Sequence, residues 1–127
     1  MKIARITLSD RASAGVYQDR SGPEIERVFS ELYPSPNSIN WLTHLMPDEQ
    51  AALEKLLIEL CDESRCDLVI TTGGTGPAPR DVTPEATRAV IQREIPGFGE
   101  IMRIASFEKV KTSILSRGTA GTRGTTL

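Results

Sequence analysis

Residues 68–84 decide the fold, and they read LVITTGGTGPAPRDVTP. The apolar run at 68–70 has the length and composition of a buried parallel strand. A turn rich in glycine follows at 73–76, and Thr83 with Pro84 then forms a good helix start, as N-cap and first helical residue. A strand, a small-residue turn and a helix N-terminus in this order can hold an anion, because glycines admit a phosphate and free N–H groups point at it. The stretch therefore predicts an α/β fold with a loop of a kind that can hold an anion.

The glycine turn matches neither of two common nucleotide-binding motifs. No lysine follows its last glycine in the place that a Walker A motif requires, and the G-x-G-x-x-G spacing with its later acidic residue is absent. The turn alone leaves ligand binding and a plain tight turn equally open. Arg80 and Asp81, adjacent just before the expected helix, favour a ligand, although an exposed surface pair is the alternative.

The segments on either side alternate between strand and helix patterns. Apolar and β-branched runs predict further strands over 3–8, 39–46 and 112–115. Apolar residues at helical spacing predict helices over 23–32, 47–64, 83–94 and 98–105. This order predicts an open, mostly parallel sheet with helices on both faces, in one domain over 1–127. Ligands of such sheets bind beyond the carboxyl ends of the strands, and the loops 9–15, 47–49 and 71–83 leave those ends.

Charge is distributed unevenly along the chain. The 127 residues are 39% hydrophobic and 25% charged, which is a globular composition, and the net charge is −2. Residues 1–70 carry 7 Lys and Arg against 12 Asp and Glu, whereas residues 71–127 carry 8 against 5. The basic half suits an anionic ligand, but the overall charge provides no basic field for nucleic acid, and we expect none as a partner.

Two cysteines, Cys61 and Cys66, have no second pair or nearby histidine to complete a zinc site, and we expect free thiols in a reducing compartment. Lys2 and Arg5 stand where a signal peptide needs an apolar run. No window approaches roughly 18 uninterrupted apolar residues, so we expect no membrane association. These features predict a cytoplasmic protein.

Asp48 has two interpretations. Its place at the first turn of the helix expected at 47–64 favours a cap. The alternative is a carboxylate that faces the glycine turn and, with Asp81, holds Mg²⁺ against a polyphosphate, because Mg²⁺ prefers one or two carboxylates plus phosphate oxygens. The loop Ser9–Gly15 offers serines and Arg11 to an anion, or only turn residues. His44, the single histidine, lies in an expected strand and disfavours histidine-based catalysis.

Taken together, the three loops resemble the molybdopterin adenylyltransferase family, which comprises MogA-like bacterial proteins and the related G domains of gephyrin and of plant molybdenum-cofactor proteins. The resemblance rests on SDRASAGVYQD at 9–19, Pro47-Asp48-Glu49, TTGGTG at 71–76 and RDVTPEAT at 80–87. Pro96-Gly97-Phe98, Leu115-Ser116-Arg117 and AGTRG at 120–124 continue it, so the match covers nearly the whole chain in order.

The resemblance implies a three-layer α/β/α sandwich of the MogA/MoaB type that assembles as a homotrimer. It implies transfer of AMP from ATP to the terminal phosphate of molybdopterin, with release of pyrophosphate and a requirement for Mg²⁺, and contact with other molybdenum-cofactor biosynthesis proteins. Asp48 and Asp81 would be catalytic and would bind the metal. The residues expected to bind the nucleotide or the pterin are Ser9, Asp10, Thr72, Gly73, Gly74, Thr75, Gly76 and Arg80.

The family continues beyond the point that matches Leu127 into another apolar strand, a loop with proline and glycine, and a final helix. We therefore expect this chain to be a C-terminally shortened form of the domain. A non-catalytic module that binds molybdopterin or nucleotide is the alternative function. A structural α/β domain whose loops are only turns is a third.

Overall fold

A parallel sheet of three strands, in the order β2–β1–β3, forms the centre of the computed structural model, which describes residues 1–127 apart from the side chain of Pro36. β1 spans Lys2–Leu8, β2 spans Asn40–Met46 and β3 spans Leu68–Thr72. The strands expected at 3–8, 39–46 and 68–70 are therefore confirmed to within two residues.

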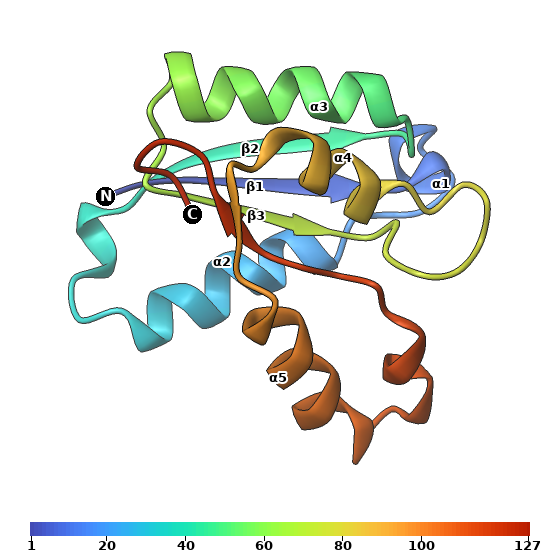
Figure 1. Ribbon diagram of the computed structural model, residues 1–127. Helices are drawn as coiled ribbons and strands as arrows, with labels where there is room; N and C mark the ends of the chain where they lie inside the picture. Colours follow the sequence, from blue (N-terminus) through green and yellow to red (C-terminus); the bar gives the residue numbers. More distant parts are fainter.

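Helices cover both faces of the sheet (Figure 1). α3 (Gln50–Ile58) continues into a π-helical turn (Glu59–Glu63), and it lies with α4 (Thr83–Val90) on one face. α2 (Ser21–Leu32) lies on the opposite face. The three-layer α/β/α arrangement is confirmed.

The hydrophobic core lies between the sheet and the layer of α3 and α4. Successive side chains of a strand point to opposite faces, so every second residue of β1 enters this core. Its buried members are Ala4, Ile6, Leu8, Leu53, Leu57, Leu60, Cys66, Ala86 and Val90. Each large apolar side chain removed from water in this way contributes about 1.5–3 kcal/mol.

The other face of β1 carries polar side chains towards α2. Arg5 forms ion pairs with Asp19, at 2.9 Å, and with Glu26 of α2, at 2.7 Å. Thr7 donates a hydrogen bond to the same Asp19 carboxylate. The expected apolar stripe of α2 is only partly used, because Phe29 packs against Trp41 whereas Leu32 remains 79% exposed.

β3 is an edge strand, and its residues are half-buried rather than buried as expected. Among the described strands only β1 pairs with it. On its free side lies the end of the chain: the Val69 N–H donates to the Leu127 carbonyl at 2.8 Å, and the Leu127 N–H donates to Asp67 at 3.2 Å. This pair of bonds has the pattern of parallel strand pairing.

Two expectations for the second half of the chain are wrong. The helix expected over 83–94 ends at Val90, and Arg93–Glu94 (β4) instead pairs antiparallel with Gly121–Thr122 (β5). The strand expected at 112–115 is a 3₁₀ helix (Lys111–Leu115), whose Ser113 hydroxyl donates to the Arg103 carbonyl of α5 (Gly97–Phe107). Three of these four residues are β-branched or apolar and fit a strand, but without a neighbouring strand this segment turns back onto α5.

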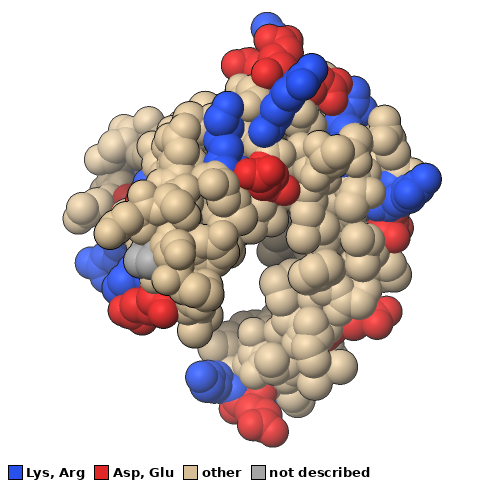
Figure 2. Space-filling model, turned by 90° about the vertical axis from the view of Figure 1, so that its left-hand side faces the viewer, with Lys and Arg blue, Asp and Glu red and all other residues tan. Residues whose placement is uncertain are grey.

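The stretch 95–115, which contains α5 and the 3₁₀ helix after it, exposes many apolar side chains. These are Ile95, Phe98, Ile101, Met102, Ile104, Phe107, Val110, Ile114 and Leu115. Figure 2 shows an opening in the face turned towards the viewer, with a rim formed mainly by uncharged residues. Two short elements complete the fold, namely α1 (Asp10–Ser13) and a 3₁₀ turn at Pro36–Ser38. No helix in the described chain combines the length and the apolar character that crossing a membrane demands.

Candidate functional site

The three loops expected to form a site do meet at the carboxyl ends of the strands (Figure 1). The first two are joined by main-chain contacts, because the Ser9 N–H donates to the Met46 carbonyl at 2.9 Å. They are also joined reciprocally: the Asp10 N–H donates to Asp48 Oδ2 at 3.1 Å, and the Asp48 N–H donates to Asp10 Oδ1 at 3.0 Å. Each aspartate thus holds the main chain of the other.

Asp48 does not cap α3, although its residue type and position favoured that interpretation. The N-cap is Glu49, and no side chain forms a cap hydrogen bond there. The carboxylate of Asp48 turns instead towards the first loop and the glycine turn. The alternative interpretation, a carboxylate at the mouth of the sheet, agrees with this geometry.

Arg80 links the third loop to the first. Its Nε donates to Asp10 Oδ2 at 2.9 Å and its Nη2 donates to Asp10 Oδ1 at 2.7 Å, which is a two-point pairing. The guanidinium lowers the pKa of the Asp10 carboxyl. Because both side chains are exposed, this pair contributes little to stability, and Arg80 remains accessible to a second anion.

The glycine turn provides the space in which the two aspartates lie. Gly73 and Gly74 have φ of 93° and 61°, which side chains rarely adopt. A Cβ added at Gly74 would lie 2.7 Å from Asp48 Oδ1. A Cβ added at Gly76 would lie 2.8 Å from Asp81 Oδ2. The absence of a side chain at Gly74 therefore leaves room for the Asp48 carboxylate, and its absence at Gly76 leaves room for that of Asp81.

Thr83 fixes this turn to α4, although not as the N-cap that the sequence predicted. The cap position is Val82, and Thr83 is already in the helix. Its hydroxyl donates to the Gly73 carbonyl at 2.8 Å, and its N–H donates to the Gly74 carbonyl at 3.0 Å. Thr83 is 2% exposed, so both bonds are protected from water.

The main chain of the turn has donors to spare. Within the described part of the chain, the N–H groups of Gly74, Thr75 and Gly76 donate no hydrogen bond. Free main-chain N–H groups in a turn before a helix form an anion-binding concavity. This arrangement supports the anion-binding interpretation over a plain tight turn.

Asp48 is the electrostatically unusual residue of the site. Burial raises the pKa of its carboxyl, and the negative charges of Asp10 and Asp81 raise it further. Its Oδ1 is buried and has no hydrogen-bond partner within the described chain. Such an oxygen is costly unless a cation or a donor meets it.

A divalent cation fits these residues. No group of three or more His, Cys, Asp or Glu side chains in the described chain could hold a metal ion by itself. Mg²⁺, however, needs only one or two carboxylates when phosphate oxygens and water supply the rest. The unpartnered Asp48 Oδ1 and the nearby Asp81 meet that requirement.

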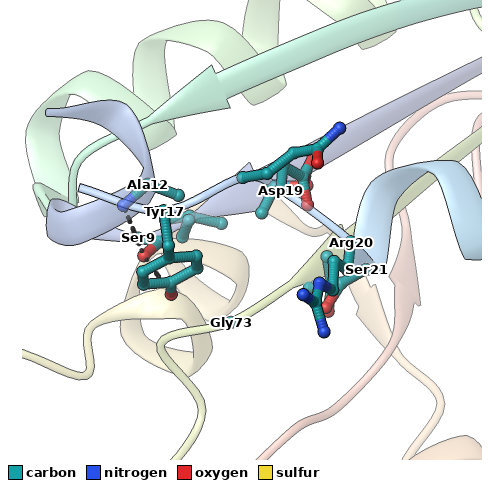
Figure 3. A pocket seen from close by; sticks show the side chains of 11 residues that line it. Ser9, Ala12, Tyr17, Asp19, Arg20, Ser21 and Gly73 are labelled. Carbon is teal, nitrogen blue, oxygen red and sulfur yellow. Dashed lines mark hydrogen bonds between the residues drawn. The ribbon is translucent and has the colours of Figure 1, made fainter. Parts of the chain in front are cut away.

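Two cavities flank the end of β3 and share Thr72 and Gly73 as a wall. The first, of about 380 Å³, lies between the first loop and the start of α2, as Figure 3 shows. Tyr17 lies on one side of it with its hydroxyl 2.8 Å from Ser9 Oγ, and Arg20 lies on the other. The second, of about 250 Å³, lies between the glycine turn and α5.

The structure brings all ten predicted site residues to one end of the sheet, where they line a cavity or form the contacts just described. Sequence reasoning missed two kinds of residue. Tyr17, which lies in the motif at 9–19, and Arg20, which directly follows that motif, line the first cavity, but neither was named as a site residue. Arg117 contacts the glycine turn from 41 residues further along the chain. Leu115-Ser116-Arg117 belongs to the resemblance, but no local pattern predicts that Arg117 contacts the glycine turn, because its approach depends on the path of the chain after α5.

Comparisons with known proteins show the family to which the chain belongs. The family described as "Probable molybdopterin binding domain" matches residues 4–127. The molybdopterin adenylyltransferase of Helicobacter pylori strain J99 is 52% identical over 125 residues, which cover 98% of this chain and 70% of that protein. The enzyme of the same name from Escherichia coli K12 is 54% identical over 117 residues, which cover 92% of this chain and 59% of that protein.

A solved structure has the same fold. The molybdopterin biosynthesis enzyme MoaB from Thermus thermophilus superposes with a TM-score of 0.87 at 40% sequence identity. The match covers 99% of this chain and 77% of that one. This chain is thus shorter than each of the three relatives described.

Proposed function

Because the chain belongs to the probable molybdopterin binding domain family, we propose that it is a molybdopterin adenylyltransferase of molybdenum cofactor biosynthesis. It would transfer AMP from ATP to molybdopterin and release pyrophosphate. The proposal takes residues 1–127 as one domain of this family, which the match over 4–127 supports.

The observation that carries the proposal is the pair of carboxylates beside one glycine turn. Asp48 lies against Gly74 and Asp81 lies against Gly76, and free N–H groups lie in the same turn. Transfer of a phosphoryl-type group depends more on positioning and charge neutralisation than on a strong base. The three loops of the site offer both, since they combine main-chain donors, Arg80 and the Asp48 Oδ1 atom that lacks a partner in the described chain.

In the reaction, an oxygen of the pterin phosphate attacks the α-phosphorus of ATP. The new oxygen–phosphorus bond forms as the bond from that phosphorus to the bridging oxygen of pyrophosphate breaks. The free N–H groups of the turn would hold phosphate oxygens, and Arg80 would exchange its contact with Asp10 for one with the substrate. Asp48 and Asp81 would hold Mg²⁺, which when bound neutralises charge on the phosphates.

Four of the expected binding residues line the two cavities. Ser9 lines the first, Thr75 lines the second, and Thr72 with Gly73 forms the wall that both cavities share. Two adjoining cavities suit a reaction that joins two substrates at one phosphorus. Both cavities adjoin the turn that carries the free N–H groups.

An assay of pyrophosphate release with ATP, Mg²⁺ and molybdopterin tests the proposal. We expect turnover by the wild-type chain and a fall of at least about 10²-fold in Asp81→Asn. The fold should survive, because the asparagine oxygen can still accept from the Ala78 N–H that Asp81 now binds at 3.0 Å. Asp62→Asn, which alters an exposed carboxylate paired with Arg123, is the matched control and should retain full turnover.

Two outcomes would contradict the proposal in different ways. Unchanged turnover in Asp81→Asn would remove Asp81 from the site. Tight binding of both substrates by calorimetry, without any pyrophosphate, would leave a binding module in place of an enzyme.

We also propose that the protein is a cytoplasmic homotrimer that meets other molybdenum-cofactor biosynthesis proteins. The two free thiols, Cys61 and Cys66, suit a reducing compartment. The exposed apolar side chains over 95–115 supply a surface that association would cover. Sedimentation velocity tests the assembly, and a monomer at micromolar concentration would count against it.

A further inference from the structure

Arg117 binds both ends of the loop that carries Asp81. Its main-chain N–H donates to the Thr75 carbonyl at 2.8 Å, and its Nε donates to the Gly76 carbonyl at 2.9 Å. Its Nη2 donates to the carbonyl of Asp81 itself, also at 2.8 Å. One residue therefore joins the beginning and the end of segment 75–81 through the main chain.

The same side chain fixes that loop to the first turn of α4. Nη1 and Nη2 both contact the carboxylate of Glu85, and the guanidinium lowers the pKa of that carboxyl. Glu85 lies two residues after Thr83, which holds the other part of the glycine turn. A planar guanidinium can serve three acceptors in different directions, whereas a lysine ammonium has no such fixed fork.

The segment around Arg117 is in turn anchored to α5. Arg103 donates from Nη1 to the carbonyls of Ser116, at 3.3 Å, and of Gly118, at 3.0 Å. Ser116 Oγ lies 3.4 Å from Thr75 Oγ1. The glycine turn is thus supported from two sides, by α4 through Glu85 and by α5 through Arg103.

We propose that Arg117 is a positioning residue, which holds the main chain of 75–81 so that the Asp81 carboxylate lies against Gly76 and faces Asp48. Its side chain is 38% exposed and that of Glu85 is 42% exposed, so their ion pair contributes little to stability. The three bonds to carbonyls, by contrast, set the geometry of the loop. The role in catalysis rests on the function proposed above, whereas the role in holding the loop does not.

Four variants separate this role from a general loss of structure. Arg117→Ala removes the side-chain bonds to Gly76 and Asp81, and Arg117→Lys keeps the charge but loses the fork. Glu85→Gln removes the ion pair and leaves the bonds to the carbonyls. Arg123→Ala is the matched control, because Arg123 also pairs with a carboxylate, Asp62, and donates to a carbonyl, that of Val90.

Steady-state kinetics should show the effect in kcat more than in KM. We expect kcat to fall about 10²-fold in Arg117→Ala, because small displacements of reacting groups cost about that much. Arg117→Lys should have a kcat between those of Arg117→Ala and wild type. Glu85→Gln and Arg123→Ala should keep kcat within about threefold of wild type, because in both variants Arg117 still binds the carbonyls of the turn. An Arg117→Ala enzyme within threefold of wild type, or an equal loss in Glu85→Gln, would overturn the proposal.

Hydrogen–deuterium exchange gives a readout that needs no activity. The peptide over 74–83 should exchange at least about tenfold faster in Arg117→Ala, with α3 unchanged and with Arg123→Ala like wild type. If the wild-type chain shows no turnover, the proposed function fails and this exchange result alone decides the role of Arg117. Unchanged exchange in 74–83 would overturn it even in an active enzyme. If Arg117→Ala exchanges faster over the whole chain, exchange over 74–83 relative to α3 is measured in Arg117→Lys instead, and that result decides the role of Arg117.

Discussion

The hydrophobic core and the rim of the site, formed by the loops 9–15, 47–49 and 71–83, differ in how their buried groups are satisfied. In the core, Ile6 and Leu53 are fully buried and their apolar surface is satisfied by contact alone. At the rim, the buried Asp48 Oδ1 has no partner in the described chain, and two successive glycines hold a positive φ. The core stabilises the fold, whereas the rim keeps polar groups in a state that costs stability until a ligand meets them.

The difference shows in how charge is handled. Away from the rim, Arg5 forms ion pairs with two carboxylates, those of Asp19 and Glu26, so its charge is compensated. At the rim, Asp10, Asp48 and Asp81 lie close enough for their charges to raise the pKa of Asp48, and Arg80 pairs with only one of them. An excess of negative charge beside free N–H groups is the arrangement that a cation and a phosphate together would resolve.

The largest effect on stability should come from the core. Leu53→Ala removes a side chain with no exposed surface, and we expect it to lower the free energy of unfolding by about 2–5 kcal/mol. The folded fraction should keep its turnover, because the Leu53 side chain belongs to the core cluster and is not among the residues of the site. Urea unfolding measures the free energy of unfolding, and an assay at a temperature well below that of thermal unfolding measures the turnover. A loss of activity in fully folded protein would show that the core and the rim are coupled.

A smaller effect on stability and a larger one on activity should come from the glycine turn. Gly74→Ala places a Cβ 2.6 Å from Thr83 Oγ1 and 2.7 Å from Asp48 Oδ1, at a φ that alanine rarely adopts. We expect a loss of about 1–3 kcal/mol in the free energy of unfolding and about 10²-fold in turnover. Gly124→Ala shares the positive φ but has no atom within 4 Å of the added Cβ, so it controls for backbone strain. Equal losses of turnover in the two variants would contradict a role for the Asp48 contact.

The smallest effect on stability, and one of opposite sign, should come from Asp48→Asn. The raised pKa of Asp48 means that the folded state holds its proton more tightly than the unfolded state, so ionisation of Asp48 costs stability near neutral pH. Asparagine has no charge to bury and can still accept from the Asp10 N–H, so the variant should be as stable as wild type or more stable. The difference in the free energy of unfolding between the variant and the wild type should shrink as the pH falls towards the ordinary pKa of an aspartate, because wild-type Asp48 then becomes protonated.

Urea midpoints of both proteins, at neutral and at mildly acidic pH, test this sign. Turnover should be lost in Asp48→Asn at every pH. In the wild type, binding of Mg²⁺ should weaken on acidification, because a protonated Asp48 cannot hold a cation. An Asp48→Asn variant that is less stable near neutral pH would show that the carboxylate is compensated in the folded protein.

The sequence predicted the parts of the fold that follow from local pattern. The strands at 3–8, 39–46 and 68–70, the apolar residues at helical spacing within 47–64, and the sheet type all agree with the structure because period and residue type specify them. The segment at 112–115 failed for the converse reason. Its residues suit a strand, but a strand forms only where another strand offers main-chain partners, and α5 lies there instead.

For the site, the sequence by itself determined which residue types stand at the ends of the strands, and the parallel order of the strands then collects them at one edge. Tertiary structure decided what those residues do. It turned Asp48 away from α3 towards Asp10, used Thr83 to fasten the glycine turn, and brought Arg117 across from beyond α5. Hydrogen bonds between residues tens of positions apart leave no local pattern, because their geometry exists only when the chain between them has already folded.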